Sequence, residues 1–531
     1  MRKTRRRGEG KTRRDWQTPV SPRLAVLALV VGLLTFGLYL PTLWSGFVYD
    51  AEAQILVDDY IHHHANFFEV VTLRVLSRDV LDYNRPVQLA SLMIDSLGWG
   101  KNPFGYHLTS NLLHALNAAM VFLLMVALGR GGAADPGRPG LLAAAVGALF
   151  FAFHPVNVEA VAEVSCREDL LVTFFVLAGL LLAVTGKGLW SGVGVVVAFL
   201  LACAAKETGI AGPFLLGVYW LLFRRKESGK KWAVLIGAAF LVAFGFLGAR
   251  FYFQPPVSDI FIHPPQYLGG SLARVFEIQP RLWVFQLTGI FWPFGLSADY
   301  VPANVAWLSL PVALIVLALF LGLQGLLGWK SRLALFGTAF FWFGLAPASN
   351  FVPMFRPLAD RFLYLPMIGM ALVLAGVLLL AVPRREVFGL LVAACAIVLI
   401  PLAALTWQRQ PVFASPLNLW RDTLAKSPFS DTAANNLGYA LFTAGEYQKS
   451  LDAFERALQL TRGTKADARA GAAMALERLG RPSAAEEALR QAIALNPLFA
   501  NPPKLVESLL SNEEHAAVLQ QINDRLTPPR P

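Results

Sequence analysis

The chain has 531 residues, of which 56% are hydrophobic and only 15% are charged, and its net charge is +11. Soluble domains carry about 25% charged residues, so this composition excludes an ordinary soluble globular enzyme. Residues 1–14 contain eight Lys or Arg and one Glu. Because a long apolar run follows this cluster, we expect residues 1–23 to be a basic cytoplasmic segment near anionic lipids, and not a nucleic-acid-binding arm.

The hydrophobic residues lie in long blocks that predict transmembrane helices. A helix needs ~20 mostly apolar residues to cross ~30 Å of hydrocarbon, and most blocks reach this length with their weakly polar flanks. We therefore predict an all-α bundle of about eleven spans over residues 24–409. The blocks are Leu24–Leu40, Leu108–Leu128, Leu141–Phe153, Leu170–Val184, Val193–Ala204, Ala211–Phe223, Trp232–Leu247, Val305–Leu327, Leu333–Ala346, Leu363–Val382 and Val387–Leu405.

The positive-inside rule orients these helices and makes residues 45–106 a large outside loop. The apolar stretch Arg281–Gly295 is short and ends in Trp-Pro-Phe-Gly. If it spans, the basic turns Lys330–Arg332 and Arg384–Arg385 lie outside, whereas both lie inside if it is re-entrant or interfacial. We expect the second arrangement, because it obeys the charge rule twice. The C-terminal tail then lies outside, on the same face as the first loop.

Residues 410–531 are amphipathic and contain an internal repeat. The residues that match tetratricopeptide spacing are Leu437, Gly438, Gly445, Tyr447, Phe454 and Ala457, followed about 35 residues later by Ala472, Ala473, Gly480, Leu489, Ala492 and Pro497. We expect Gly445 and Gly480 at the turns between paired helices, where a small residue permits close packing. Two clear repeats are fewer than such stacks need, so flanking half repeats or the membrane domain should complete the core. The repeats predict a protein-docking surface; the alternative is packing on the membrane domain alone.

Ionisable side chains accumulate at the predicted outside face, where their cost makes each a functional candidate. Asp50 and Glu52 follow the first span, and the other candidates come from later segments: Arg85, His154, Glu159, Arg167, Lys206 and Arg361. Acids and bases converging on one face are typical of a site that binds a phosphate-bearing substrate and activates a nucleophile. The alternatives are loop charges at Asp50 and Glu52, a turn cap at Lys206, and ordinary contacts of Glu159 and Glu163 with Arg167.

Nothing in the sequence requires a metal or a cofactor. His62–His64 are consecutive and cannot all face one ion from a regular helix or strand, so we expect a solvated or interfacial run. The three cysteines are scattered without paired spacing, which predicts neither a disulfide framework nor a zinc site. A divalent metal is compatible with the site but is not implied by it.

Several short strings occur in a fixed order along the chain. They are Gly46-Phe47-Val48-Tyr49-Asp50, Arg85-Pro86, Asn102-Pro103-Phe104-Gly105-Tyr106-His107-Leu108, His154-Pro155-Val156-Asn157-Val158-Glu159-Ala160-Val161, Arg167-Glu168-Asp169, Lys206-Glu207 and Asp360-Arg361-Phe362-Leu363-Tyr364-Leu365-Pro366. In this order, ahead of a tetratricopeptide tail, they resemble the transmembrane-and-tetratricopeptide O-mannosyltransferase family and its bacterial relatives. That family is similar to the type-C glycosyltransferases, which take a sugar from a polyprenyl-phosphate carrier on the non-cytoplasmic face.

The resemblance implies an acidic catalytic residue in the first outside loop, and Asp50 occupies that place. The family usually has a second acid directly after it, whereas here Ala51 intervenes before Glu52. A carboxylate is needed because a serine or threonine hydroxyl is a poor nucleophile until its proton is taken. The leaving phosphate needs cations, for which Arg85, Arg167, Lys206 and Arg361 are candidates, Arg361 above all because Asp360 and Tyr364 can orient it. His154 and Glu159 are expected to position the donor.

We therefore expect the protein to transfer a sugar, with mannose as the first candidate, from a polyprenyl phosphate to a protein Ser/Thr or a glycan. The expected location is a bacterial inner membrane with periplasmic repeats, or an endoplasmic reticulum membrane with lumenal repeats. A non-catalytic membrane scaffold whose repeats recruit proteins is the alternative. A transporter is disfavoured because the charges cluster at one face and not in mid-span.

Overall fold

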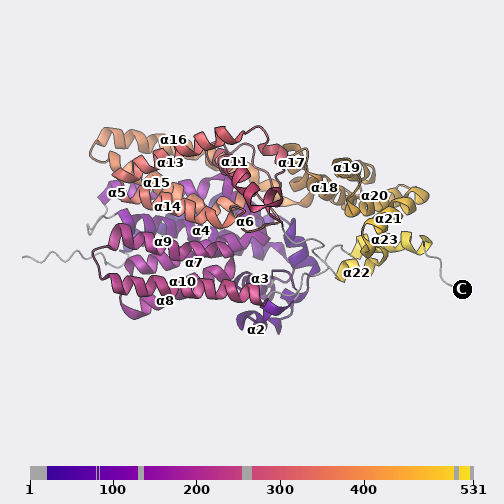
Figure 1. Ribbon diagram of the computed structural model, residues 1–531, viewed down its shortest axis with the longest axis horizontal. Helices are drawn as coiled ribbons and strands as arrows, with labels where there is room; N and C mark the ends of the chain where they lie inside the picture. Colours follow the sequence, from indigo (N-terminus) through magenta and orange to yellow (C-terminus); the bar gives the residue numbers. More distant parts are fainter. Residues whose placement is uncertain are drawn as a thin grey trace, which may run out of the picture.

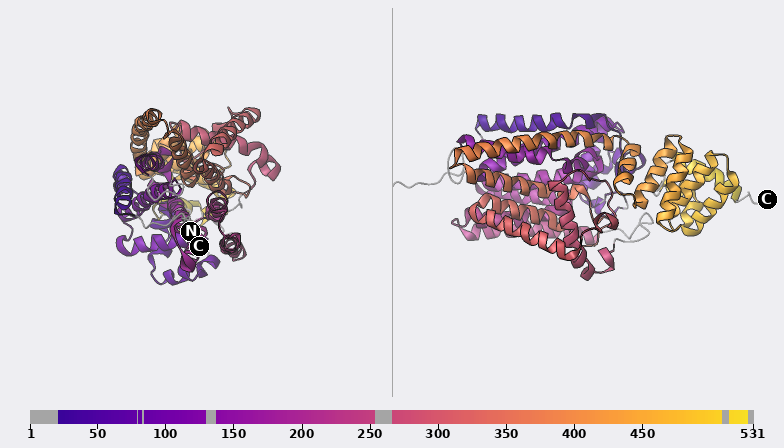
Figure 2. Two further views of the ribbon diagram at one scale, coloured as in Figure 1. Left: turned by 90° about the vertical axis from the view of Figure 1, so that its left-hand side faces the viewer. Right: turned by 90° about the horizontal axis from the view of Figure 1, so that it is seen from above.

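The computed structural model describes residues 21–78, 80–82, 84–129, 137–253, 266–507 and 513–526, and all regular structure in these ranges is helical. A bundle of long helices is followed by a smaller helical array that continues from one of its ends (Figure 1). Figure 2 shows the array as an extension along the long axis of the bundle. The predicted all-α architecture, a polytopic membrane bundle followed by tetratricopeptide repeats, is confirmed.

Every predicted apolar block overlaps a helix of the bundle, although the block Val305–Leu327 begins before its helix and Leu24–Leu40 runs past the end of its helix. The bundle helices are α1 (Pro22–Leu38), α4 (Pro103–Gly129), α5 (Gly137–Phe153), α7 (Arg167–Thr185), α8 (Gly188–Ala205), α9 (Ala211–Tyr219), α10 (Gly229–Tyr252), α11 (Leu272–Phe291), α13 (Leu310–Lys330), α14 (Arg332–Leu345), α15 (Tyr364–Ala381) and α16 (Arg385–Arg409). Within the described ranges, seven helices are long and apolar enough to cross a membrane, or eight if the pair Gly137–Phe153 and Pro155–Ala162, bent by 49°, is one span. Pro22–Leu38 and Arg332–Ala348 are shorter apolar helices, and α11 is in neither group.

Helices α14 and α15 cross so closely that their backbones touch. A Cβ atom on Gly337 would lie 2.6 Å from the carbonyl oxygen of Gly369, and one on Gly369 would lie 2.3 Å from the backbone nitrogen of Phe341. Small residues permit this approach, which gives van der Waals packing where lipid supplies no hydrophobic driving force. The crossing fixes α15, whose N-terminal end continues the helical turn η11 (Asp360–Leu363).

The first loop folds over the end of the bundle. The helical turn η1 (Leu40–Trp44) leads into it, and the loop contains the helical turns η2 (Glu52–Val57), η3 (Tyr60–His62) and η4 (Arg74–Ser77) and the helices α2 (Asn66–Val71) and α3 (Pro86–Trp99). Of the histidine run that we expected to be solvated or interfacial, His63 and His64 are exposed, whereas His62 is half-buried and lies within hydrogen-bond distance of the Ser96 hydroxyl (2.7 Å) and the Ile55 carbonyl oxygen (2.8 Å). Packing of the loop on α3 explains this difference.

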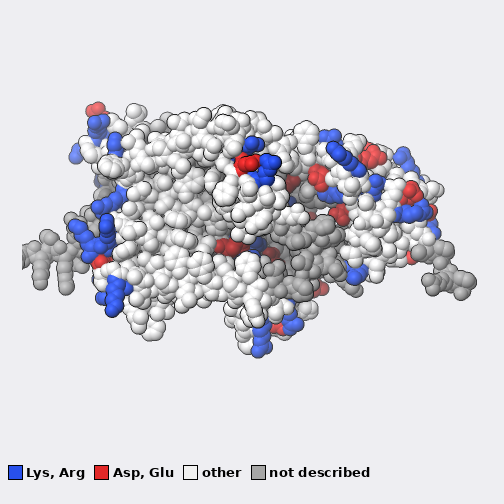
Figure 3. Space-filling model, viewed as in Figure 1, with Lys and Arg blue, Asp and Glu red and all other residues white. Residues whose placement is uncertain are grey.

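Basic turns gather at the opposite end of the bundle. Lys and Arg side chains cover the end that lies on the left in Figure 3, away from the array. The turns between α13 and α14 and between α15 and α16 carry Lys330, Arg332, Arg384 and Arg385. The turn before α10 is tied to the end of α7 by a hydrogen bond from Arg224 to the Val184 carbonyl oxygen (3.0 Å).

The array consists of α17 (Pro416–Lys426), α18 (Asp431–Thr443), α19 (Tyr447–Leu460), α20 (Ala466–Arg478), α21 (Pro482–Leu495), α22 (Pro502–Glu507) and α23 (Glu513–Leu526). The pairs α18–α19 and α20–α21 are the two predicted repeats. Buried Leu419 and Trp420 of α17 belong to the hydrophobic core of the bundle, whereas Ala434 of α18 belongs to that of the repeats. The two cores therefore divide inside α18, beyond the boundary that we predicted at residue 409.

The expected reason for glycine at the repeat turns is wrong. Gly445 and Gly480 have φ values of 76° and 71°, and a Cβ atom at either would have no neighbour within 4 Å. Their turns need the left-handed backbone that glycine adopts without steric cost, and not close packing. Close packing instead requires Gly438 and Gly471, because a Cβ atom at these positions would lie 2.7 and 2.3 Å from the Phe454 ring.

Candidate functional site

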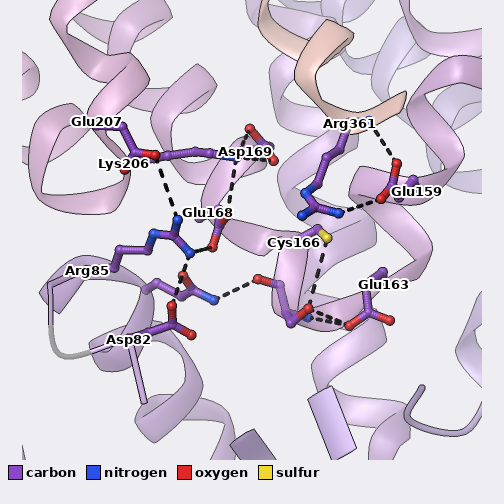
Figure 4. A network of polar contacts seen from close by, with 12 residues as sticks. Asp82, Arg85, Glu159, Glu163, Cys166, Glu168, Asp169, Lys206, Glu207 and Arg361 are labelled. Atoms are coloured by element: carbon purple, nitrogen blue, oxygen red, sulfur yellow. Dashed lines mark hydrogen bonds and ion pairs between the residues drawn. The ribbon is translucent and has the colours of Figure 1, made fainter. Parts of the chain in front are cut away.

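Charged side chains from distant segments meet at the end of the bundle that faces the array. Figure 4 shows two neighbouring groups, one around Arg85 and one around Arg361. The first loop, the turn after α8 and the start of α7 supply the first group. The short helix α6 (Val158–Ala162) and η11 supply the second. Of the predicted residues, Arg85, Lys206, Glu159 and Arg361 are in these groups.

Arg85 lies at the centre of the first group. Its Nη1 atom is 2.8 Å from Glu168 and 3.0 Å from Asp82, and its Nη2 atom is 3.8 Å from Glu207. Lys206 is buried and lies 2.7 Å from Asp169 and 3.2 Å from Glu168. Buried charges persist only when paired and hydrogen-bonded, and here each cation contacts more than one carboxylate. This group is a preformed wall of paired charges beside the site, in which the carboxylates outnumber the cations.

Arg361 is fixed by one carboxylate and keeps one side of its guanidinium unused. Its backbone N–H (2.9 Å) and its Nη1 atom (2.5 Å) both donate to Glu159. Within the described residues its buried Nε has no hydrogen-bond partner and Nη2 makes none. The Nε–Nη2 edge is the side of an arginine that can grip two oxygens of a phosphate at once. Glu159 therefore orients Arg361 so that this edge is available to a ligand.

The expectation that Asp360 and Tyr364 orient Arg361 is wrong. Asp360 instead accepts a hydrogen bond from Tyr300 (2.6 Å) and pairs with Arg409 (2.9 Å). The Tyr364 hydroxyl lies 2.7 Å from His114 and 3.2 Å from Asn117 in the interior of the bundle. These partners lie far away in the sequence, and no local spacing indicated them.

Asp50 begins the short helix that follows the extended residues 45–48. Its carboxylate has no hydrogen bond or ion pair with any residue that the structure describes. The side chain is accessible to solvent but is surrounded by protein, and this surrounding protein raises its pKa to about 6, whereas the charge of Arg361 lowers it. The charges of Arg85, Asp82 and Glu168 also act on Asp50, so it lies beside both groups.

Glu52 lies two residues further along the same turn. It is half-buried and has no hydrogen bond to a described residue. Burial raises its pKa to about 7. A carboxylate with a raised pKa and unoccupied oxygens can accept a proton near neutral pH, so Asp50 and Glu52 are both chemically competent as bases.

His154 and Arg167, the other two residues predicted to contact the donor, lie outside the two groups and are engaged by protein partners. The ring of His154 is fully buried and is within hydrogen-bond distance of the Ile290 carbonyl (2.9 Å) and the Val156 backbone nitrogen (3.3 Å). Arg167 is fully buried and pairs with Asp95 at 2.5 Å. Both side chains are held by protein partners, because their segments cross the interior of the bundle.

The alternative that Glu159 and Glu163 contact Arg167 is also wrong. Glu159 binds Arg361, as described above. Glu163 instead accepts hydrogen bonds from the hydroxyl (2.6 Å) and backbone N–H (3.1 Å) of Ser165. It therefore caps the turn that leads into α7.

A cavity of about 210 Å³ lies beside the second group. Its lining is mostly apolar, with Phe285, Trp292, Leu296 and Leu363 among the residues, and Asp360 and Tyr300 supply polar atoms. In the part of the chain that the structure describes, no group of three or more His, Cys, Asp or Glu side chains is arranged to hold a metal ion.

Comparisons with known proteins agree with the sequence motifs. The Tetratricopeptide repeat family profile matches residues 427–497. Human protein O-mannosyl-transferase TMTC3 is 24% identical over 89% of this chain and 55% of its own length. Protein O-mannosyl-transferase Tmtc1 of Drosophila melanogaster is 36% identical over 26% of this chain and 16% of its own length.

A solved structure also matches most of the chain. ArnT from Cupriavidus metallidurans bound to undecaprenyl phosphate is 15% identical with a TM-score of 0.39, and the match covers 95% of this chain and 89% of that one. The curated O-mannosyl-transferases are longer, and the chain spans 55% of the human TMTC3 protein. The resemblance to the transmembrane-and-tetratricopeptide O-mannosyltransferases that the motifs indicate is confirmed.

Proposed function

We propose that this protein is a membrane glycosyltransferase that transfers mannose from a polyprenyl-phosphate carrier to a serine or threonine hydroxyl of a protein. The observation that carries the proposal is Asp50, a carboxylate with a raised pKa and no described protein partner, which lies close enough to Arg361 for the guanidinium charge to lower its pKa. A base and a phosphate-binding cation are the two groups that this transfer needs. The similarity to named O-mannosyl-transferases supports the choice of reaction.

The residues suggest how one turnover proceeds. The Nε–Nη2 edge of Arg361 binds the phosphate of the carrier, and Glu159 keeps that edge in place. The acceptor hydroxyl oxygen attacks the anomeric carbon of the sugar, and Asp50 takes the hydroxyl proton. The bond between the anomeric carbon and the phosphate oxygen breaks, and the electron pair leaves with the polyprenyl phosphate. Arg361 stabilises the negative charge on the leaving group.

The position of the repeats supports a protein acceptor. The array continues from the end of the bundle that carries the site (Figure 1). Stacked helical repeats form extended surfaces that bind peptides. We place this end on the non-cytoplasmic side, because the basic turns lie at the other end and positive charge marks the cytoplasmic side.

Purified protein in detergent, given radiolabelled polyprenyl-phosphate mannose and a Ser/Thr-rich peptide, tests the proposal. We expect label to enter the peptide in an alkali-labile O-linked form, and the same peptide with Ala in place of Ser and Thr should remain unlabelled. Polyprenyl-phosphate glucose should be a poorer donor. A correctly folded protein that labels neither a peptide nor a glycan acceptor would contradict the proposal and favour the scaffold alternative.

A further inference from the structure

The residue before Asp50 has an unusual backbone conformation. Tyr49 has a φ of 59°, in the left-handed region that residues with a side chain rarely adopt. Such a conformation persists only where the surrounding structure imposes it, and it is common at functional sites. The backbone on both sides is anchored, since buried Val48 packs in the core of the bundle and buried Ala51 in that of the first loop.

Two side chains from distant segments hold the Tyr49 ring. The edge of the Trp420 indole meets it with ring centroids 5.2 Å apart and an angle of 64° between the planes. The Arg356 guanidinium lies over its face, 4.5 Å from the ring centroid. Both arrangements are attractive, because the ring has a negative face and a positive edge. Trp420 is buried in α17, and the Gly46 N–H donates to the Ala414 carbonyl (3.0 Å) just before that helix.

Arg356 connects the ring to the first repeat. Its Nη1 atom donates to the Ala298 carbonyl (3.0 Å) and lies 3.4 Å from Asp299. Asp299 in turn accepts a hydrogen bond from the Ser430 hydroxyl (2.5 Å), the residue that caps the N-terminus of α18. A continuous set of contacts therefore runs from the first repeat helix, through Asp299 and Arg356, to the ring next to Asp50.

We propose that Tyr49 is a positioning residue whose ring, clamped between Trp420 and Arg356, sets the direction of the Asp50 carboxylate. This inference rests on the proposed function, because it assumes that Asp50 takes the acceptor proton. It also gives α17 and the start of α18 a part in the chemistry, in addition to any part of the repeats in acceptor binding. The Tyr49 hydroxyl makes no hydrogen bond to a described residue, so the ring alone does the positioning.

Substitution of the ring tests the inference. Tyr49→Leu removes the aromatic contacts but keeps an apolar side chain, and Leu73 of this chain adopts the same left-handed backbone with a φ of 62°. Tyr49→Phe keeps the ring and is the matched control. Arg356→Met removes the cation over the ring and is the second test if Tyr49→Leu fails to fold. Transfer from labelled polyprenyl-phosphate mannose, its pH profile and a melting curve are measured for each.

In Tyr49→Leu we expect kcat to fall by about 10–100-fold, because a misplaced catalytic group costs up to about 100-fold. The KM for the donor should stay unchanged, whereas loss of a phosphate contact would raise it. The acidic limb of the pH profile of kcat/KM should move to lower pH as Asp50 turns towards water, a change that general destabilisation would not produce. Tyr49→Phe should behave like the wild type, and Arg356→Met like Tyr49→Leu.

The outcomes separate this inference from the proposed function. If the wild type is active and a folded Tyr49→Leu protein has a normal kcat and pH profile, the positioning role is overturned and the proposed function is left intact. If Tyr49→Leu does not fold, the same result for a folded Arg356→Met protein leads to the same conclusion. A raised donor KM with normal kcat in Arg356→Met would also overturn it, since Arg356 would then be a donor contact. A wild type without transfer activity would overturn both proposals.

Discussion

Asp50 makes no ion pair with a described residue and Arg361 pairs with one carboxylate, although Arg85 also has a buried Nε atom without a hydrogen-bond partner. The oxygens of Asp50 and the Nε–Nη2 edge of Arg361 face no protein partner. Lys206 and Arg85 each contact two or more carboxylates. Unengaged polar atoms in a built site are the ones left for a substrate, so we assign binding and proton transfer to these two residues.

The raised pKa of Asp50 predicts the pH dependence of transfer. The base must be ionised to accept a proton, and the surrounding protein raises its pKa to about 6. Activity should therefore be low at pH 5, rise through pH 6 and level off above pH 7. The measurement is kcat/KM for the donor against pH in an ionic-strength-matched buffer series. An acidic limb centred near pH 4, the ordinary range of an Asp carboxyl, would contradict the raised pKa of Asp50 in the site.

Substitution of Arg361 should weaken donor binding. Arg361→Lys keeps the charge but loses the planar edge that grips two phosphate oxygens. We expect the donor KM to rise about 10-fold or more, in line with the loss of a charge-assisted hydrogen bond. Arg274→Lys is the matched control, because that side chain is mostly exposed and its ion pair among the described residues is with Glu277 in α11. Equal donor KM values in the wild type and Arg361→Lys would refute the phosphate assignment.

Sequence reasoning could identify the acids and bases of the site but not their partners. Asp50 and Arg361 were found because their strings resemble a known family. Nothing local indicates that Glu159 orients Arg361, 202 residues away along the chain, or that Arg167 pairs with Asp95 inside the bundle. Such pairs depend on which helices lie side by side. For the same reason Tyr300 and Arg409 were not assigned to the site.

At the scale of the elements, the crossing of α14 and α15 controls where Arg361 lies. The two backbones touch at Gly337 and Gly369, and α15 begins directly after η11, which carries Arg361. Because interiors are close-packed, a side chain added at this crossing has to push the helices apart.

Gly369→Ala should therefore destabilise the protein by about 1–3 kcal/mol, as overpacking does. Its Cβ would lie 2.3 Å from the backbone nitrogen of Phe341, which cannot rotate away. Gly389→Ala in α16 is the control, since a Cβ there has no neighbour within 4 Å. Thermal unfolding of both purified variants is the measurement. Equal melting temperatures would mean that the helices do not cross as described.

Hydrophobic run lengths predicted the helices of the bundle well, because crossing hydrocarbon demands long apolar segments whatever their neighbours. The two repeats could also be predicted from the sequence, since their spacing recurs along the chain. The structural reason for glycine at each repeat position could not be predicted from the sequence. Gly438 and Gly445 look equivalent in the sequence, yet one contacts the Phe454 ring and the other has a left-handed backbone.

At the scale of the molecule, the charges divide the bundle into two ends. The basic turns lie at one end, and the site, the first loop and the array lie at the other (Figure 3). Both ends of the stretch 281–295 lie near the site, because Trp283 at its start and Ser297 just after its end contact Ser349 and Ser427 there (3.0 and 3.4 Å). This arrangement agrees with the expectation that the stretch 281–295 does not reverse the topology.

Reporter fusions test the resulting orientation. A reporter active only outside the cytoplasm should be active when fused at residue 445, between α18 and α19, and inactive at residue 228, in the basic turn before α10. A cytoplasmic reporter at the same two positions should give the opposite pattern. Cytoplasmic activity at residue 445 would contradict the placement of the site on the non-cytoplasmic face.

The central claim is that Asp50 takes the proton of the acceptor hydroxyl. Asp50→Asn is nearly isosteric and removes no described contact, so insertion and melting temperature should not change. A general base contributes about 10²–10⁴-fold to rate, and transfer from labelled polyprenyl-phosphate mannose should fall by that factor. Glu52→Gln, the matched control, should lose less, because its spacing departs from the family pattern. A folded Asp50→Asn protein that transfers mannose at the wild-type rate would contradict the account.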